Sequence, residues 1–160
     1  MRHLITVGLI AFAASAAAAP DYRTIVMEIE VNKPAAAVWD RVGHYCDIER
    51  WLDVQCKIVT GDGGIGTVRS LDNGRVEEIM IARTDLSYGY TQPVKEGAFY
   101  NLYHGFLEAQ PISSGRSKLV YTMFYDASDK ADEAAKQAVM TQRRNRFEGA
   151  LKKMKQIAEQ

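Results

Sequence analysis

Residues 22–31 alternate between apolar and polar side chains. The apolar positions are Ile25, Met27, Ile29 and Val31. A period of two is typical of a strand with one buried face, so the first strand is predicted over Tyr22–Val31. Two short helices are predicted next. The first begins near Pro34, which suits an opening helical turn because its missing N–H would be unpaired there anyway.

Short β-rich runs separated by turn residues predict the rest of a sheet. The predicted strands are Gln55–Thr60, Gly66–Leu71, Arg75–Ala82, Leu86–Gln92, Phe99–Glu108 and Ser117–Tyr125. Between the second and third of these, Asp72-Asn73-Gly74 is a hairpin turn of the Asn-Gly type. Every link except the first is of hairpin length. The pattern therefore predicts one antiparallel sheet of about seven strands.

The C-terminal part of the chain is predicted to form one helix of roughly thirty residues, capped by Ser128 or Asp129. Its apolar stripe consists of Ala131, Ala134 or Ala135, Ala138 or Val139, Phe147, Leu151, Met154 and Ala158. Such spacing keeps these positions near one side of a helix, and we expect that side to lie across the concave face of the sheet. The predicted fold is α+β, with a single domain over residues 20–160.

The first 19 residues have a different composition from the rest. A short basic start, Met-Arg-His, precedes an apolar run over residues 4–12 and an alanine-rich stretch over residues 13–19. This order is typical of a cleavable signal peptide and predicts a periplasmic or secreted protein. The apolar run is short for a membrane span, so no stable span is expected after cleavage.

The charge of the predicted mature chain is nearly balanced. The leader contains only Arg2 of the 20 lysines and arginines, which stand against 20 aspartates and glutamates. A nucleic-acid-binding protein usually needs a basic excess to displace counterions, so the balance argues against nucleic acid as a partner. Basic residues on the C-terminal helix, among them Arg143, Arg144 and Arg146, are interspersed with glutamates. We interpret this segment as a solvated helix face.

The two cysteines, Cys46 and Cys56, both lie in the predicted mature region. In an oxidising compartment such a pair is usually bridged, so we expect a disulfide between the first short helix and the second strand. A metal site would need more ligands than this pair and the distant His44. A nucleophilic cysteine would need a base that the sequence does not single out. No metal and no cofactor are expected.

The stretch Val31–Leu71 carries the features by which the chain can be compared with known families. It contains two short helices followed by a strand and a Gly-x-Gly-x-x-Arg motif. The matching residues are Trp39, Trp51, Cys56, Gly64, Gly66 and Arg69. In these features the chain resembles the START-like superfamily of polyketide cyclase/dehydrase-type proteins (SRPBCC), as an exported bacterial-type member. The resemblance implies the helix-grip fold, with a cavity between the sheet and the C-terminal helix.

Adjacent carboxylates on one predicted strand are the first candidates for chemistry. Glu77 and Glu78 must point to opposite faces, so one of them shares a face with apolar neighbours. In the superfamily a strand glutamate reaches into the cavity, and this resemblance favours Glu78. An apolar surrounding would raise the pKa of such a carboxyl, which suits an acid, a base or a polar ligand anchor. The alternative is that one carboxylate is solvated and the other pairs with Arg69 across the hairpin.

Aromatic side chains with polar tips suit a pocket that is mostly apolar but partly wet. Tyr88 and Tyr90 share one strand face, and Tyr121 and Met123 share another, although such residues are also ordinary in a core. His104 lies on the predicted sixth strand. The candidate ligand-binding set is Arg69, Glu78, Tyr88, Tyr90, His104, Tyr121 and Met123.

Three functions fit this sequence. The first is an exported protein that binds a small apolar or amphipathic molecule, such as an aromatic compound or a lipid. The second is a cyclase, dehydrase or hydrolase that uses Glu78, the one candidate catalytic residue, with a cavity tyrosine as acid and base. The third is a structural or interaction module with a filled core. Binding ranks first because no cyclase-specific catalytic motif is present, and a fold by itself does not define an activity.

Overall fold

The computed structural model describes residues 19–93 and 102–160, which form one sheet and three helices. The strands are β1 (Tyr22–Val31), β2 (Cys56–Thr60), β3 (Val68–Leu71), β4 (Val76–Thr84), β5 (Ser87–Thr91), β6 (Tyr103–Ser113) and β7 (Arg116–Asp126). The helices are α1 (Ala35–Val42), α2 (Ile48–Leu52) and α3 (Glu133–Glu159). Within these residues, no helix is both long and apolar enough to cross a membrane. Nearly all of the predicted signal peptide, and the predicted start of the sixth strand at Phe99, lie outside the described residues.

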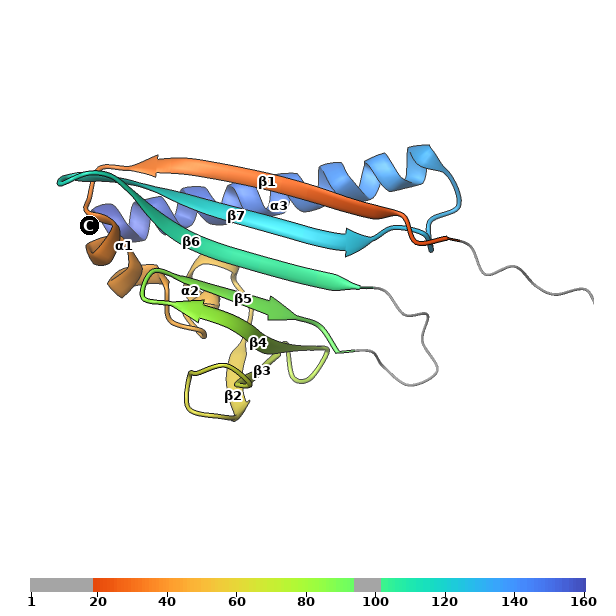
Figure 1. Ribbon diagram of the computed structural model, residues 1–160, viewed down its shortest axis with the longest axis horizontal. Coiled ribbons are helices and arrows are strands. Elements are labelled where there is room, and N and C mark those ends of the chain that lie inside the picture. The colour runs from red at the N-terminus through yellow and green to blue at the C-terminus, as the bar shows by residue number, and fades with distance from the viewer. Residues whose placement is uncertain (1–18, 94–101) are drawn as a thin grey trace, which may run out of the picture.

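The strands pair in the order β1-β7-β6-β5-β4-β3-β2, and every pair is antiparallel. Consecutive strands from β2 to β7 are neighbours, as hairpin-length links require. The chain crosses from β1 at one edge to β2 at the other through α1 and α2 (Figure 1). The predicted α+β helix-grip fold, with seven antiparallel strands, is therefore confirmed.

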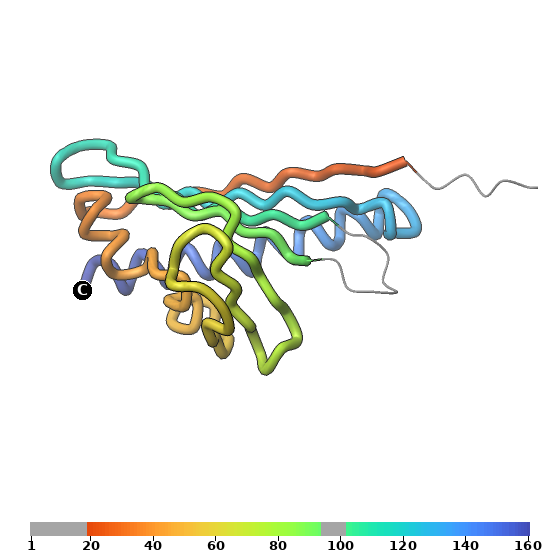
Figure 2. The backbone as a smooth tube through the Cα atoms, turned by 60° about the horizontal axis from the view of Figure 1, so that its bottom comes forward, coloured from red at the N-terminus to blue at the C-terminus, as the bar shows by residue number. Residues whose placement is uncertain are grey.

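The inner face of the sheet follows the predicted alternation. On β1, Ile25, Met27 and Val31 are buried, whereas Thr24 and Glu28 are exposed. The same period places alternate residues of β6 and β7 against the core. α3 crosses this face along its length, and its C-terminal end lies beside α1 in both views (Figures 1 and 2).

The two halves of α3 pack differently. All of its buried residues belong to the C-terminal half: Phe147, Ala150, Leu151, Met154, Ile157 and Ala158. This confirms the predicted stripe from Phe147 onwards. In the first half, Ala131 precedes the helix and Ala134 and Ala138 are exposed, whereas the alternatives Ala135 and Val139 are partly buried, and Val139 packs against the core. This half therefore buries less apolar surface, and polar contacts help to hold it.

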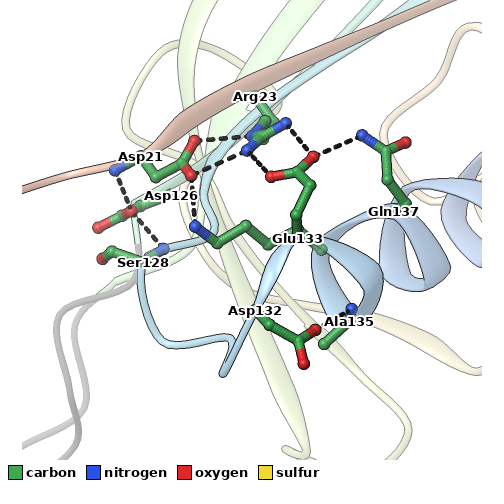
Figure 3. A network of polar contacts seen from close by, with 9 residues as sticks. Asp21, Arg23, Asp126, Ser128, Asp132, Glu133, Ala135 and Gln137 are labelled. Atoms are coloured by element: carbon green, nitrogen blue, oxygen red, sulfur yellow. Dashed lines mark hydrogen bonds and ion pairs between the residues drawn. The ribbon is translucent and has the colours of Figure 1, made fainter.

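Ion pairs tie the first turn of α3 to the start of β1 (Figure 3). The Arg23 guanidinium lies 2.7 Å from a carboxylate oxygen of Asp21 and 2.7 Å from one of Glu133. The Lys136 ammonium lies 2.6 Å from the other oxygen of Asp21. Hydrogen bonds from Arg23 and Lys136 hold the pKa of Asp21 well below its usual range. These contacts hold the first turn of α3, and the partly buried Val139 and Met140 follow one turn later.

The start of α3 differs from the prediction. The helix is capped by Asp132, whose side chain accepts a hydrogen bond of 2.8 Å from the N–H of Ala135, and not by Ser128 or Asp129. The Asp126 carboxylate accepts a hydrogen bond of 2.9 Å from the N–H of Ser128, which keeps the chain in a turn at that point. The helix therefore begins only after this turn has ended.

The end of β6 also lies beyond its predicted limit at Glu108. Pro111 cannot donate to a ladder, and in a sequence it normally marks the end of a strand. Here the pairing of β6 with β7 shifts register between Pro111 and Ser113, so the strand continues to Ser113. A bulge at the edge of the pairing thus accommodates the proline.

The predicted disulfide between Cys46 and Cys56 is present. It joins the segment between α1 and α2 to the first residue of β2. Trp51 lies inside the loop that the disulfide closes; its side chain is buried, and its indole N–H donates to the carbonyl of Val42 at 3.3 Å. The bridge therefore fixes the edge of the sheet to the two short helices.

Candidate functional site

The centre of the candidate site is a buried ion pair on the β3–β4 hairpin. The turn residues Asp72, Asn73 and Gly74 all have positive φ angles, and the resulting register places Arg69 opposite Glu78. Both side chains point into the molecule, with 0% of Arg69 and 3% of Glu78 exposed. Glu77 is exposed on the opposite face. Glu78 is thus the inward-facing carboxylate.

Both carboxylate oxygens of Glu78 accept hydrogen bonds. Oε2 accepts from Nε of Arg69 at 2.8 Å and lies 2.6 Å from Nη2 of the same side chain. Oε1 accepts from the amide of Gln92 at 3.2 Å. Charge-assisted bonds of this kind hold a carboxylate in one orientation. Glu78 is therefore a fixed acceptor rather than a mobile group.

Three tyrosine rings surround the guanidinium of Arg69. Its Cζ atom lies 4.1 Å from the ring centre of Tyr45, 5.1 Å from that of Tyr90 and 5.6 Å from that of Tyr88. Nη1 donates to the backbone carbonyl of Tyr45, whose hydroxyl donates to the carbonyl of Glu78 at 3.1 Å. Ring faces attract a cation, so this cage helps to offset the cost of burying the charge.

A second polar contact joins the two sides of the core. The hydroxyl oxygens of Tyr90 on β5 and Tyr121 on β7 lie 2.7 Å apart. Burial raises the pKa of both hydroxyls well above the usual value. At neutral pH these groups are phenols that can donate or accept a hydrogen bond, and neither is a base.

Glu78 and Tyr90 line a cleft of about 290 Å³ between α2, strands β3 to β6 and α3. Its apolar wall comprises Ile48, Leu52, Val54, Leu71, Val76 and Phe147. Its polar and aromatic lining adds Asp72, Arg75, Gln92, Tyr103, Gln142, Arg143 and Arg146. The cleft thus combines an apolar body with a fixed acceptor at Glu78 and basic groups on α3.

Not all predicted site residues reach this cleft. Tyr121 and Met123 are fully buried on β7 and do not line it. Tyr88 lines a second cleft of about 400 Å³, together with Tyr45. Arg69 contacts residues of both clefts, because its guanidinium lies against Tyr45 and Tyr88 of the second and against Tyr90 of the first.

His104 is not part of either cleft. The alternation of β6 turns Tyr103 inward, so its neighbour His104 points to the outer face. There the imidazole stacks on the ring of Phe124, with ring centres 6.3 Å apart. One residue of register decides this outcome, because successive side chains of a strand point to opposite faces.

Several cleft residues escaped sequence reasoning. Tyr45 lies in a loop without periodicity, and Gln92 follows the last residue of β5. Tyr103 carries the alternation signal of β6 and could have been found from it. Arg143 and Arg146 lie on a helix whose charges resembled an ordinary solvated face. Within residues 19–93 and 102–160, no group of three or more potential ligand side chains gathers in a way that could hold a metal ion.

Comparisons with known proteins agree with this architecture. A crystal structure of the ZhuI aromatase/cyclase from Streptomyces sp. R1128 has a TM-score of 0.65, with 18% identity over 87% of this chain and 94% of that one. A Thermobifida fusca protein solved by NMR also has a TM-score of 0.65, with 22% identity over 82% of this chain and 90% of that one. Norcoclaurine synthase from Thalictrum flavum, solved with dopamine and hydroxybenzaldehyde, has a TM-score of 0.59, with 16% identity over 84% of this chain and 87% of that one.

At these identities the structural likeness establishes the fold alone. No curated protein sequence matches the chain significantly. A family model does match, and it extends from the first residue of β1 to the last residue of α3, over residues 22–159. The chain therefore belongs to the family described as polyketide cyclase / dehydrase and lipid transport.

Proposed function

We propose that this chain is an exported protein that binds one small amphipathic molecule in the 290 Å³ cleft between the sheet and α3. The apolar wall takes the body of the ligand, and Glu78 with Gln92 takes a polar group. The observation that carries this proposal is the buried Arg69–Glu78 pair, whose carboxylate lines a cleft that combines an apolar wall with polar side chains.

A buried ion pair is a weak means of stabilising a fold. Replacing such a pair by apolar side chains of similar volume is often neutral or stabilising. An oriented carboxylate at the wall of a cleft offers something that an apolar pair cannot, namely an acceptor for a ligand hydroxyl or N–H. This supports a role for Glu78 as a polar anchor.

The volume of the cleft limits the size of the ligand. Pockets for small molecules usually span about 300–1,000 Å³, so this cleft, at about 290 Å³, lies just below that range. A molecule of one or two rings fits such a space, whereas a lipid with two acyl chains does not. A cleft of this size also argues against a module with a filled core.

Binding is favoured over acid–base catalysis by the contacts of Glu78. A general acid or base must exchange a proton with its substrate. Both oxygens of Glu78 already accept hydrogen bonds from Arg69 and Gln92, which suits a fixed anchor better than a proton carrier. The likeness to an aromatase/cyclase and to norcoclaurine synthase supports the fold alone. The activity of this chain has to be inferred from its own residues.

Export is supported by two features of different kinds. The leader-like composition of residues 1–19 is typical of a signal peptide. The Cys46–Cys56 disulfide suits an oxidising compartment, because cytosolic thiols are usually kept reduced. N-terminal sequencing of the protein recovered from the periplasm or the medium tests this part of the proposal, and an intact Met1 would contradict it.

A blocking substitution tests the binding site. Val54 lines the cleft, so Val54→Trp should fill part of it and weaken binding of neutral probes such as 2-naphthol and indole at least tenfold. Val59 on β2 is exposed outside the cleft, and Val59→Trp is the matched control. Isothermal titration calorimetry should show saturable 1:1 binding by the wild type and the control. Absence of binding, or equal binding by both variants, would refute the assignment of the site.

A further inference from the structure

Two arginines of α3 line the cleft. Arg143 and Arg146 lie three residues apart, on the same side of the helix, whereas Glu78 lines the cleft from β4. The ion pairs of residues 19–93 and 102–160 include neither of them. The arginine between them, Arg144, does have such a partner, since it lies 3.6 Å from Glu148.

Arg143 is held in place by aromatic rings. Its Cζ atom lies 4.0 Å from the ring centre of Tyr125 and 4.9 Å from that of Tyr103. Its Nη1 atom is buried against these side chains and has no hydrogen-bond partner within the described part of the chain. Stacking of this kind orients a guanidinium before a ligand arrives and leaves its edge available for a planar anion.

The positive charge at this end of the cleft is not cancelled by its other lining residues. The Glu78 carboxylate is paired with Arg69, and Asp72 lies 3.2 Å from Arg75. Among the described lining residues, Arg143 and Arg146 thus carry the positive charge that no lining carboxylate balances. Their influence reaches Tyr103: burial raises the pKa of its hydroxyl to about 12, and both arginines act against that rise.

We propose that the cleft selects a small aromatic carboxylate that carries a hydroxyl group at its other end. The hydroxyl donates to Glu78, the ring lies against the apolar wall, and the carboxylate accepts from Arg143 and Arg146. This inference rests on the proposed binding function and specifies its ligand class. Arginine and carboxylate match in geometry, because two parallel N–H groups meet two oxygens.

A matched pair of ligands tests the inference. 2-Naphthol and 6-hydroxy-2-naphthoate share the ring system and the hydroxyl, and only the second carries a carboxylate. In isothermal titration calorimetry, the wild type should bind the naphthoate at least tenfold more tightly than 2-naphthol. Because exposed charges are screened by salt, part of this preference should decline as ionic strength rises.

Single substitutions identify the side chains that cause the preference for the naphthoate. Arg143→Gln should remove the preference for the naphthoate by weakening its binding more than that of 2-naphthol, since only the naphthoate has a carboxylate that loses a contact. Arg146→Gln should reduce the preference in the same direction. Arg144→Gln is the matched control, because Arg144 donates to the carbonyl of Val26 at 3.2 Å and does not line the cleft. Circular dichroism checks that each variant is folded.

The outcomes separate this inference from the function on which it rests. Binding of 2-naphthol with no preference for the naphthoate would overturn the anion site and leave the proposed binding function intact. Failure to bind either ligand would overturn both. A preference that Arg144→Gln removes as fully as Arg143→Gln would show a general charge effect and would also overturn the assignment.

Discussion

The Glu78→Gln substitution tests how far the fold depends on its buried ion pair. Glutamine has nearly the same size as glutamate, so the packing of the cleft wall is kept. The guanidinium of Arg69, which is fully buried, loses the carboxylate that balances its charge. The loss in the free energy of unfolding is therefore the cost of burying a cation without a counter-ion.

The magnitude follows from the surroundings of Arg69. Removing one partner of a buried pair typically costs about 3–5 kcal/mol. The ring of Tyr45, 4.1 Å from Cζ, still attracts the cation, which favours the lower end, about 3 kcal/mol. For a domain of this size each kcal/mol lowers the Tm by about 2–4 °C, so the Tm should fall by roughly 10 °C.

Urea unfolding followed by tryptophan fluorescence measures this free energy, and a double-mutant cycle assigns it to the pair. Arg69→Met combined with Glu78→Gln leaves no buried charge, so the double variant should be more stable than the sum of the single effects predicts. Glu77→Gln is the control on the exposed face and should change stability by less than about 0.5 kcal/mol. A loss below about 1 kcal/mol for Glu78→Gln, or additive effects in the cycle, would refute the reasoning.

Three further outcomes are expected. Reducing the disulfide, which closes a loop of sequence separation 10, should lower stability by about 3 kcal/mol in urea unfolding, and no change would mean that the loop is already rigid. Met154→Ala, at a fully buried position, should cost about 2–5 kcal/mol, whereas Val139→Ala should cost less than about 1 kcal/mol; equal losses would contradict the division of α3. The lowered pKa of Asp21, held by Arg23 and Lys136, gives stability that is present above about pH 4 and is lost as the pH falls further, so the hydrogen-exchange protection factors in the first turns of α3 should be smaller at pH 3 than at pH 5.

Local periodicity explains why the sheet could be predicted. The alternation of β1 and the Asn73-Gly74 turn each determine which residues face inward and how neighbouring strands align. The disulfide could also be predicted from the sequence, because two cysteines close in the chain allow only one pairing. The pairing of a strand carboxylate with Arg69 across the hairpin is one of the two alternatives that the sequence leaves open, and it is the one found, because the short turn sets the register of the two strands.

Contacts between distant segments could not be predicted in the same way. The cap of α3 depends on Asp126, which holds Ser128 in a turn, and no pattern within the helix reveals that contact. The inward or outward direction of His104 depends on one residue of register. The stacking of Arg143 on Tyr125 joins two elements whose relative position only the folded chain defines.

The division of α3 into two halves links the fold to the candidate site. Its C-terminal half supplies the apolar surface that the sheet needs, through residues such as Leu151 and Met154. Its N-terminal half contributes the partly buried Val139 and Met140, and its first turn is held by the ion pair between Arg23 and Glu133. Arg143 lies between these two regions, one turn before the first buried residue, Phe147. The core therefore fixes where the cleft lies, while stacking on Tyr103 and Tyr125 positions Arg143 at its basic side. Under the binding function that we propose, substitutions in the first half of α3 should change ligand preference without dismantling the core.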